Sequence, residues 1–237
     1  MKHLIISMDL SFKSTGMTIA KLDNNIAEEI SFYRVLFDKE LSLHHKEYSP
    51  KSIKNVNDFV YRMPHYILVN DLVIDEDDEN NVEQCETTLK AIFCSSAIKK
   101  IIDKHCKIND YDFVVFCIEN YIMPDFGGKN QLKSVSGLIM LQGFIREHII
   151  KEYANSKKIK LLTPTPSKIK SFFANNGRAD KSLMIKSFIE NYDGKKLIPD
   201  IEKLTISSIN DVVDSFAMAM YSYHQLINND IQTIEVL

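Results

Sequence analysis

Six consecutive apolar residues, Phe113 to Ile118, constrain the fold of this chain more than any other feature. The run is rich in β-branched and aromatic side chains and is too short for a helix, so its composition favours a strand. A strand that is apolar at every position must be covered on both faces, as in the middle of a parallel or mixed sheet. We therefore predict a central strand over Phe113–Ile118.

The N-terminal region has the pattern of a β-hairpin followed by a third strand. Two apolar runs, Leu4–Met8 and Met17–Leu22, flank the turn-forming residues Ser11–Gly16. The segment Ile30–Phe37 alternates and is rich in aromatic residues, which is typical of a half-buried strand. This arrangement places Asp9 at the end of the first strand.

Helices and strands alternate in the rest of the chain. Apolar residues at helical spacing predict long helices at 86–105, 135–153 and 208–227, short helices at 167–173 and 181–192, and a short strand at 159–162. Such an order predicts an α/β fold with a mixed sheet, antiparallel at one edge and parallel where helices form the crossovers. We expect a single domain over residues 1–237, with a variable, irregular insertion at about 38–81.

Composition excludes several classes of protein. Hydrophobic residues make up 45% and charged residues 26% of the chain, which does not fit a disordered protein. No apolar run reaches the roughly 18 residues of a membrane span. Asp9 interrupts the apolar N-terminus after five residues, which favours a cytoplasmic strand over a signal peptide. The four cysteines form no C-x-x-C pair, which favours reduced thiols over a zinc site.

Charge is distributed unevenly, although the net charge is only −3. Residues 71–86 contain eight acids and no Lys or Arg, whereas residues 129–186 contain twelve Lys and Arg against three acids. The basic stretch indicates a localised anionic partner, and the alternative is an ordinary lysine-rich surface. Since an acidic tract repels DNA, residues 71–86 are expected to face away from such a partner or to contact another protein.

Four carboxylates occupy positions suited to metal chemistry. Asp9 ends the first strand, Glu119 follows the central strand, and Asp211 and Asp214 share one face of the last helix. Strand ends and helix starts meet at one edge of an open sheet. Clustered carboxylates repel one another unless a cation joins them, and oxygen ligands favour Mg²⁺ or Mn²⁺. Two such ions about 3.5–4 Å apart can promote phosphodiester hydrolysis.

Each acid alone has an ordinary alternative. Asp9 could begin a turn, and Glu119 could be an exposed strand end. Asp211 and Asp214 could be acids in the first turn of a helix capped by Ser208, where the helix dipole favours negative charge. The joint pattern is more specific than any single member.

Two blocks of sequence resemble RuvC-type Holliday junction resolvases. Asp9-Leu10-Ser11 with Thr15-Gly16 is similar to the family motif D-P-S-x-x-x-T-G, with Leu10 in place of proline. Asn210–Ala217 is similar to the closing D-x-x-D-A-x-A helix. Glu119, placed after an apolar strand, resembles the second acid of the family.

A third block lies between them. Lys170 and Lys181, eleven residues apart with Asn176–Asp180 between them, resemble the region V-K-x(6)-G-x-A-x-K. The matching blocks 4–36, 86–192 and 207–227 occur in the family order and cover about two thirds of the chain.

The resemblance implies a ribonuclease H-like mixed sheet flanked by helices, and a homodimer that nicks two strands of a Holliday junction in branched DNA. It implies hydrolysis with two Mg²⁺ ions per active site, for which Mn²⁺ substitutes. The metal ligands would be the four acids, Asp9, Glu119, Asp211 and Asp214, and the other catalytic residues would be Lys170 and Lys181, near the scissile phosphate. Basic side chains would contact DNA phosphates: Lys129, Lys133, Lys168, Lys170, Arg178, Lys181 and Lys186.

Resolvases of this type insert an aromatic wedge three residues after the second acid. Ile122 occupies that position here, with Tyr121 beside it and Phe126 further along, so the identity of the wedge is open. Tyr121 is our candidate DNA contact in this loop. The helix at 135–153 is our candidate dimer interface, because it has more apolar positions than one sheet face requires.

Three other functions remain open from the sequence. The same fold could serve as a non-catalytic DNA-binding module, although all four acids are retained. A sugar-kinase-like nucleotide-binding domain shares a similar hairpin motif, but the chain lacks a second Gly-rich phosphate loop. A nuclease of the same chemistry could cut other branched or flapped DNA. The Asn-, Lys- and Ile-rich composition suits an AT-rich genome, including that of a phage or virus acting in the host cytoplasm.

Overall fold

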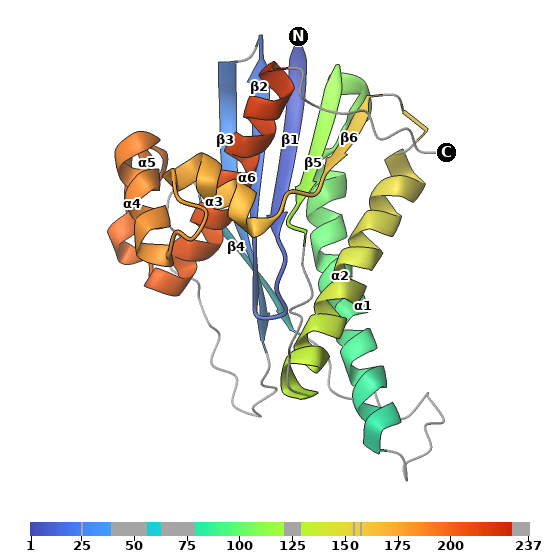
Figure 1. The fold of residues 1–237 in the computed structure, drawn as a ribbon. Helices are drawn as coiled ribbons and strands as arrows, with labels where there is room; N and C mark the ends of the chain where they lie inside the picture. Colours follow the sequence, from blue (N-terminus) through green and yellow to red (C-terminus); the bar gives the residue numbers. More distant parts are fainter. Residues whose placement is uncertain are drawn as a thin grey trace.

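A mixed sheet forms the centre of the molecule. The computed structural model describes residues 1–24, 26–38, 56–62, 79–120, 129–153, 155–156 and 158–228. Within these residues six strands pair in the order β4-β3-β2-β1-β5-β6 (Figure 1). Their bounds are β1 (Lys2–Asp9), β2 (Ser14–Asp23), β3 (Ile26–Asp38), β4 (Val56–Arg62), β5 (Phe113–Ile118) and β6 (Ile159–Leu162). Strand β2 is antiparallel to both of its neighbours, β1 and β3. Strand β5 is parallel to β1, β6 is parallel to β5, and β4 is parallel to β3.

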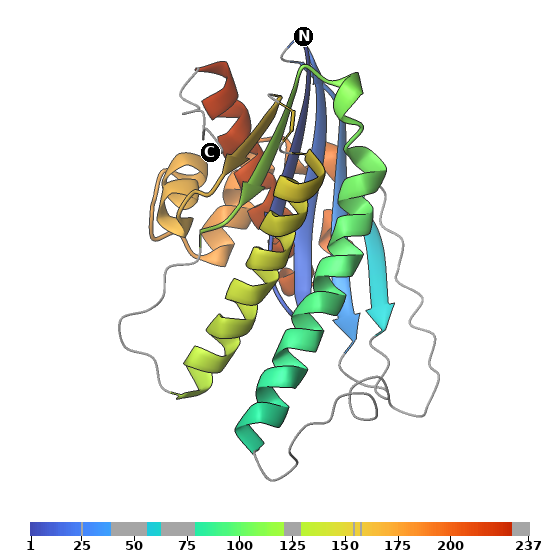
Figure 2. The same ribbon diagram turned by 90° about the vertical axis from the view of Figure 1, so that its right-hand side faces the viewer.

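Helices cover both faces of the sheet. Two long helices, α1 (Glu79–His105) and α2 (Lys129–Tyr153), lie side by side on one face (Figure 2). The other face carries α3 (Pro166–Ala174), α4 (Lys181–Asn191) and α6 (Ile206–Ile227). Shorter elements complete the described chain: η2 (Ile108–Asp110), α5 (Gly194–Leu197) and η3 (Ile201–Lys203). The α/β fold with a mixed sheet predicted from the sequence is confirmed.

The central strand shows why the apolar run was informative. Residues Val114, Phe116 and Ile118 pack toward α1 and α2, whereas Val115 and Cys117 pack toward the opposite helical layer. Because side chains alternate along a strand, both sets are buried and β5 tolerates no polar residue before its end. The same alternation directs the residue after Ile118 toward the α6 face.

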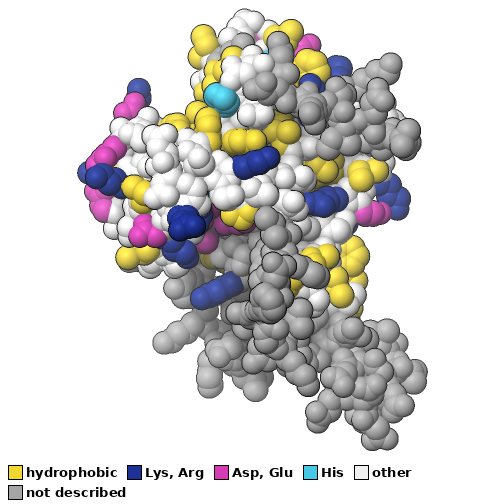
Figure 3. Space-filling view, viewed as in Figure 1, with side chains coloured by type: hydrophobic (Ala, Val, Ile, Leu, Met, Phe, Trp, Pro, Cys, Tyr) yellow, Lys and Arg dark blue, Asp and Glu magenta, His cyan; other side chains and the backbone are white. Residues whose placement is uncertain are grey.

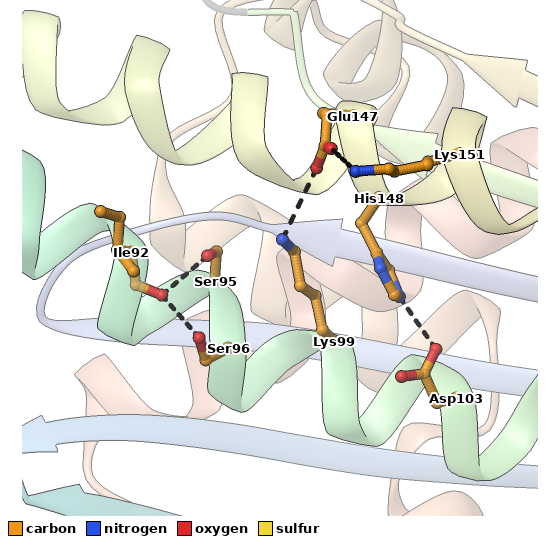
Figure 4. A network of polar contacts seen from close by, with 8 residues as sticks. All are labelled: Ile92, Ser95, Ser96, Lys99, Asp103, Glu147, His148 and Lys151. Carbon is orange, nitrogen blue, oxygen red and sulfur yellow. Dashed lines mark hydrogen bonds and ion pairs between the residues drawn. The ribbon is translucent and has the colours of Figure 1, made fainter.

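Polar contacts join the two long helices at their outer surface (Figure 4). The His148 ring lies 2.9 Å from Asp103, and the Lys99 ammonium lies 3.8 Å from Glu147. Beneath these contacts Ile98 and Ile102 of α1 share a buried cluster with side chains of α2. Surface ion pairs of this kind contribute at most about 1 kcal/mol each, so the apolar cluster provides most of the helix pairing.

Several predicted boundaries differ from the structure. Strands Phe113–Ile118 and Ile159–Leu162 have the predicted bounds, but α1 and α2 begin earlier, at Glu79 and Lys129. Their first turns are polar and carry no apolar periodicity, so the pattern missed them. Strand β4 lies inside the segment expected to be irregular and pairs with β3. Residues 39–55 and 63–78 lie outside the described part of the chain.

The last helix also begins earlier than predicted. Thr205 is its N-cap, and the Thr205 hydroxyl accepts a hydrogen bond from the Ser208 backbone at 3.3 Å. The prediction of Ser208 as cap is therefore wrong. Asp211 and Asp214 consequently lie in the second and third turns, so the alternative that they are ordinary first-turn acids is wrong as well.

The described residues include no helix with the length and apolarity needed to cross a bilayer.

Candidate active site

A row of residues across three strands marks the site. Asp9 of β1 is paired with Gly16 of β2, and Gly16 is paired with Arg34 of β3. Directly paired residues project from the same face of a sheet. On the other side of β1, Met8 is paired with Ile118, so Glu119 follows next to Asp9. The row beneath α6 therefore consists of Glu119, Asp9, Gly16 and Arg34. Gly16 leaves a gap in this row because glycine has no side chain.

Helix α6 approaches the sheet at this gap. A Cβ atom placed on Gly16 would lie 1.9 Å from the Asp211 carbonyl oxygen, so only glycine permits this contact. One turn further along, the Ser7 hydroxyl donates to the Ser215 carbonyl at 2.7 Å, and the Thr18 and Ser215 hydroxyls are 2.9 Å apart. These contacts hold α6 against the sheet, so that Asp211 and Asp214 lie over the row formed by Glu119, Asp9, Gly16 and Arg34.

The turn after Asp9 is closed by Thr15. Its buried hydroxyl accepts a hydrogen bond from the Ser11 backbone N–H at 3.1 Å and donates to the Ser11 carbonyl at 3.0 Å. The threonine and glycine of the resolvase-like motif thus have separate structural roles. Thr15 shapes the turn, and Gly16 admits the helix.

Hydrogen bonds to the backbone of Glu119 and Asn120 fix the position of Glu119 at the end of β5. The buried Gln142 of α2 donates its side-chain amide to the Glu119 carbonyl at 2.8 Å. The next residue, Asn120, donates its backbone N–H to the Pro164 carbonyl at 2.8 Å. The end of β5 is thereby tied both to α2 and to the segment that leads into α3.

Electrostatics show that the acids are neighbours. Burial raises the pKa of Asp9 well above its ordinary value, and Asp214, Glu119 and Asp211 raise it further. Burial, followed by the charge of Asp214, raises the pKa of Glu119 to about 7. Burial also raises the pKa of Asp214 to about 6, even though the Asn210 amide donates to its carboxylate at 2.6 Å. The cluster is therefore costly to ionise without a compensating cation.

Two lysines oppose this repulsion. Lys170 of α3 lowers the pKa of Glu119 and Asp214, and Lys181 of α4 lowers that of Asp9, Asp211 and Asp214. Helix α3 ends at Asn175 in the left-handed conformation, with φ 53°. Helix α4 begins at the N-cap Asp180, whose carboxylate accepts from the Leu183 N–H at 2.8 Å. This turn between two capped helices explains why residues eleven apart both face the acids.

The donor set suits a hard cation by its chemistry. It consists of oxygen ligands only, and the buried Asn210 Oδ1 beside Asp214 has no hydrogen-bond donor among the described residues. Within the described ranges, however, no three His, Cys, Asp or Glu side chains already form a closed metal-binding group. The four acids are thus brought to one place without closing around it. The predicted metal site remains a prediction.

The predicted DNA contacts fall into two groups. Lys168, Arg178 and Lys186 are exposed on the α3 and α4 side, where Figure 3 shows basic side chains beside acidic ones. Lys186 also lies 3.9 Å from Glu190, one helical turn away. Lys129 and Lys133 belong to the first turns of α2, but their side chains are outside the described part. Tyr121, Ile122 and Phe126 lie wholly outside it.

Sequence reasoning missed four residues that support the acids. Ser14 and Arg34 contact or face Asp211, Asn210 donates to Asp214, and Gln142 donates to the Glu119 backbone. Only Arg34 had a visible signal. It is a charged residue on the strand face that also carries Ile30, Phe32 and Leu36, and it is 7% exposed.

Three solved structures similar to this chain are of RuvC and of a Holliday junction resolvase. RuvC from Thermus thermophilus has 8% sequence identity and a TM-score of 0.45, with 95% of this chain and 96% of that chain covered. The same protein in complex with a Holliday junction substrate has 9% identity, a TM-score of 0.49 and the same coverage. The yeast mitochondrial resolvase Ydc2 has 12% identity and a TM-score of 0.45, with 94% and 80% covered.

No protein-family model and no curated protein matches the chain. At 8–12% identity, the likeness to these three structures concerns the fold alone.

Proposed function

We propose that this protein is a metal-dependent endonuclease that resolves four-way DNA junctions. One observation carries the proposal. Asp214, Glu119 and Asp211 lie close enough to raise the pKa of Asp9, Asp214 raises that of Glu119, and Lys170 and Lys181 act on the same acids in the opposite direction. Acids that repel one another beside lysines are suited to hold divalent cations and to receive a phosphate.

The chain's own residues would share the work as follows. Asp9, Glu119, Asp211 and Asp214 would hold Mg²⁺ ions, two per site. Such ions, when bound, activate water and stabilise the leaving oxygen of a phosphodiester. Lys170 and Lys181 would orient the scissile phosphate and offset the negative charge that grows on it in the transition state. Gln142 and Asn210 would hold Glu119 and Asp214 in position.

The substrate class follows from charge and symmetry. Lys168, Arg178 and Lys181 are exposed on α3, on α4 and in the segment between them, and would contact DNA phosphates without reading bases. A four-way junction has two-fold symmetry, and the described residues of each chain bring together one such acid cluster, so a two-fold dimer would cut two strands. Helix α2 supports this assembly because Ile139 and Ile150, eleven residues apart on one side of the helix, are 40% and 48% exposed.

The test is cleavage of labelled four-way, three-way, flap and linear DNA in Mg²⁺, in Mn²⁺ and in EDTA. We expect metal-dependent, paired, symmetric nicks in the four-way junction and little cutting of linear duplex. Equal cutting of flaps and three-way branches would favour the broader branched-DNA nuclease. Tight junction binding with no cleavage in any metal would favour the non-catalytic module.

A further inference from the structure

Asp211 differs from Asp9 and Glu119 in its surroundings. After burial, Asp214 and Glu119 have the largest effects on the pKa of Asp9, and Asp214 has the largest effect on that of Glu119. The groups that act on the pKa of Asp211 after burial are Ser14, Arg34 and lysines. The Ser14 hydroxyl donates a hydrogen bond of 2.5 Å to Asp211 Oδ2. Asp211 is therefore held from the side of the sheet that lies away from Glu119.

The strand register explains this asymmetry. Gly16 separates Asp9 from Arg34 in the paired row, and the Asp211 backbone sits directly over Gly16. Asp211 thus lies between an acid on one side and a buried guanidinium on the other. Ser14 is two residues before Gly16 on the same strand, so its side chain projects from the same face.

The burial of Arg34 indicates that its charge is compensated by neighbouring groups. Arg34 is 7% exposed, and a charge taken out of water is costly unless it is compensated. It is close enough to lower the pKa of Asp211. Arg34 is planar, permanently charged and held on a central strand, so it provides a fixed positive charge rather than a mobile one.

We propose that Ser14 and Arg34 are positioning residues that hold the Asp211 carboxylate in the inward orientation needed for cation binding. This inference rests on the proposed nuclease function. Asp211 and Asp9 would both hold a cation, and the Ser14 hydroxyl, bonded to Asp211 Oδ2, would fix the orientation of the Asp211 carboxylate. Groups that support metal ligands in this way typically change metal affinity or activity by about 10–100-fold when they are removed.

The experiment measures Mn²⁺ binding to the full chain without DNA, by calorimetry and by electron paramagnetic resonance, together with cleavage. We expect Ser14→Ala to weaken Mn²⁺ binding by about tenfold or more. Ser14→Thr, which keeps the hydroxyl on a strand, should restore it. Arg34→Met should weaken binding, and Arg34→Lys should recover part of the loss. Ser31→Ala is the matched control, because Ser31 is a strand serine that contacts Glu29 instead, at 3.1 Å.

A double-mutant cycle separates positioning from general destabilisation. If Ser14 acts through Asp211, then adding Ser14→Ala to Asp211→Asn should produce no further loss of Mn²⁺ affinity. Ser14→Ala with wild-type Mn²⁺ affinity, or an equal loss in Ser31→Ala, would overturn the inference while leaving the proposed nuclease intact. A wild-type protein that neither binds Mn²⁺ nor cleaves any branched DNA would overturn both. Melting in EDTA identifies any variant that is simply unfolded, and the Ser14→Thr comparison then decides.

Discussion

The Asp211 carbonyl oxygen lies over Gly16 so closely that a Cβ atom on Gly16 would be 1.9 Å away. A backbone atom cannot rotate aside as a side chain can, so any larger residue must displace α6 from the sheet. Because α6 carries both Asp211 and Asp214, this contact links the packing of a helix to the assembly of the carboxylate site.

The first prediction concerns that contact. Gly16→Ala should destabilise the protein by about 1–3 kcal/mol, the usual cost of overpacking, and should reduce cleavage more than the loss of folded protein explains. Thermal denaturation and cleavage at a temperature where the variant is folded provide the measurement. Gly143→Ala on α2 is the stability control, since its Cβ would meet nothing within 4 Å. Equal effects of the two substitutions would contradict the role given to Gly16.

The second prediction concerns the acids. Asp9→Asn, Glu119→Gln, Asp211→Asn and Asp214→Asn should each reduce cleavage by at least about 100-fold, because even supporting groups are worth 10–100-fold. Junction binding should persist, because the basic surface is unchanged. Gel-shift binding in Ca²⁺ and cleavage in Mg²⁺ give the two readouts. Near-normal nicking by two or more of these variants would disprove the assignment.

The third prediction separates catalysis from DNA binding in the two lysines. Lys170→Ala and Lys181→Ala should slow single-turnover cleavage at saturating enzyme, since a charge near the phosphate acts most in the transition state. Lys168→Ala, an exposed neighbour on α3, should mainly weaken binding. If the lysine variants show unchanged rates and only weaker binding, they are phosphate contacts alone.

The fourth prediction follows from the raised pKa values of Glu119, about 7, and Asp214, about 6. Between the ordinary carboxyl pKa and these values, the folded protein holds more protons than the unfolded chain. Stability in EDTA should therefore fall as the pH rises from about 4.5 to 7. Melting temperatures across this range measure the effect, and Glu119→Gln should flatten it.

A cation reverses this trend, because it binds ionised carboxylates. The rise in melting temperature caused by Mg²⁺ should be larger at pH 8 than at pH 5.5. Stabilisation by Mg²⁺ that is independent of pH would show that the ion binds elsewhere.

The fifth prediction concerns assembly. The protein should sediment as a homodimer at micromolar concentration and should cut a cruciform plasmid by paired nicks. Ile139→Glu or Ile150→Glu, which places a charge on the exposed side of α2, should favour the monomer and uncouple the nicks. Glu152→Lys, a charge change on the same helix, is the control. A wild-type monomer that nicks linear duplex as readily as the cruciform would favour the general branched-DNA nuclease.

The local pattern of apolar residues in the sequence was sufficient to predict the sheet and the helices that cover it. The apolar run Phe113–Ile118, the alternation in β3 and the helical spacing in α2 depend on neighbours in the chain, because periodicity reflects which face each element buries. The same reasoning placed Asp9, Glu119, Asp211 and Asp214 at strand ends and on one helix face. Polar first turns, as in α1, and the parallel partner β4 escaped it, since neither has an apolar period of its own.

The sequence by itself determined the mixed sheet and the identity of the acids, while tertiary structure decided how those acids are held. Whether Gly16 is a turn residue or a contact point depends on α6, which lies almost two hundred residues later. The support from Ser14, Arg34, Gln142 and Asn210 is set by strand register and helix packing. Such contacts join side chains distant in the chain, and no local spacing encodes them.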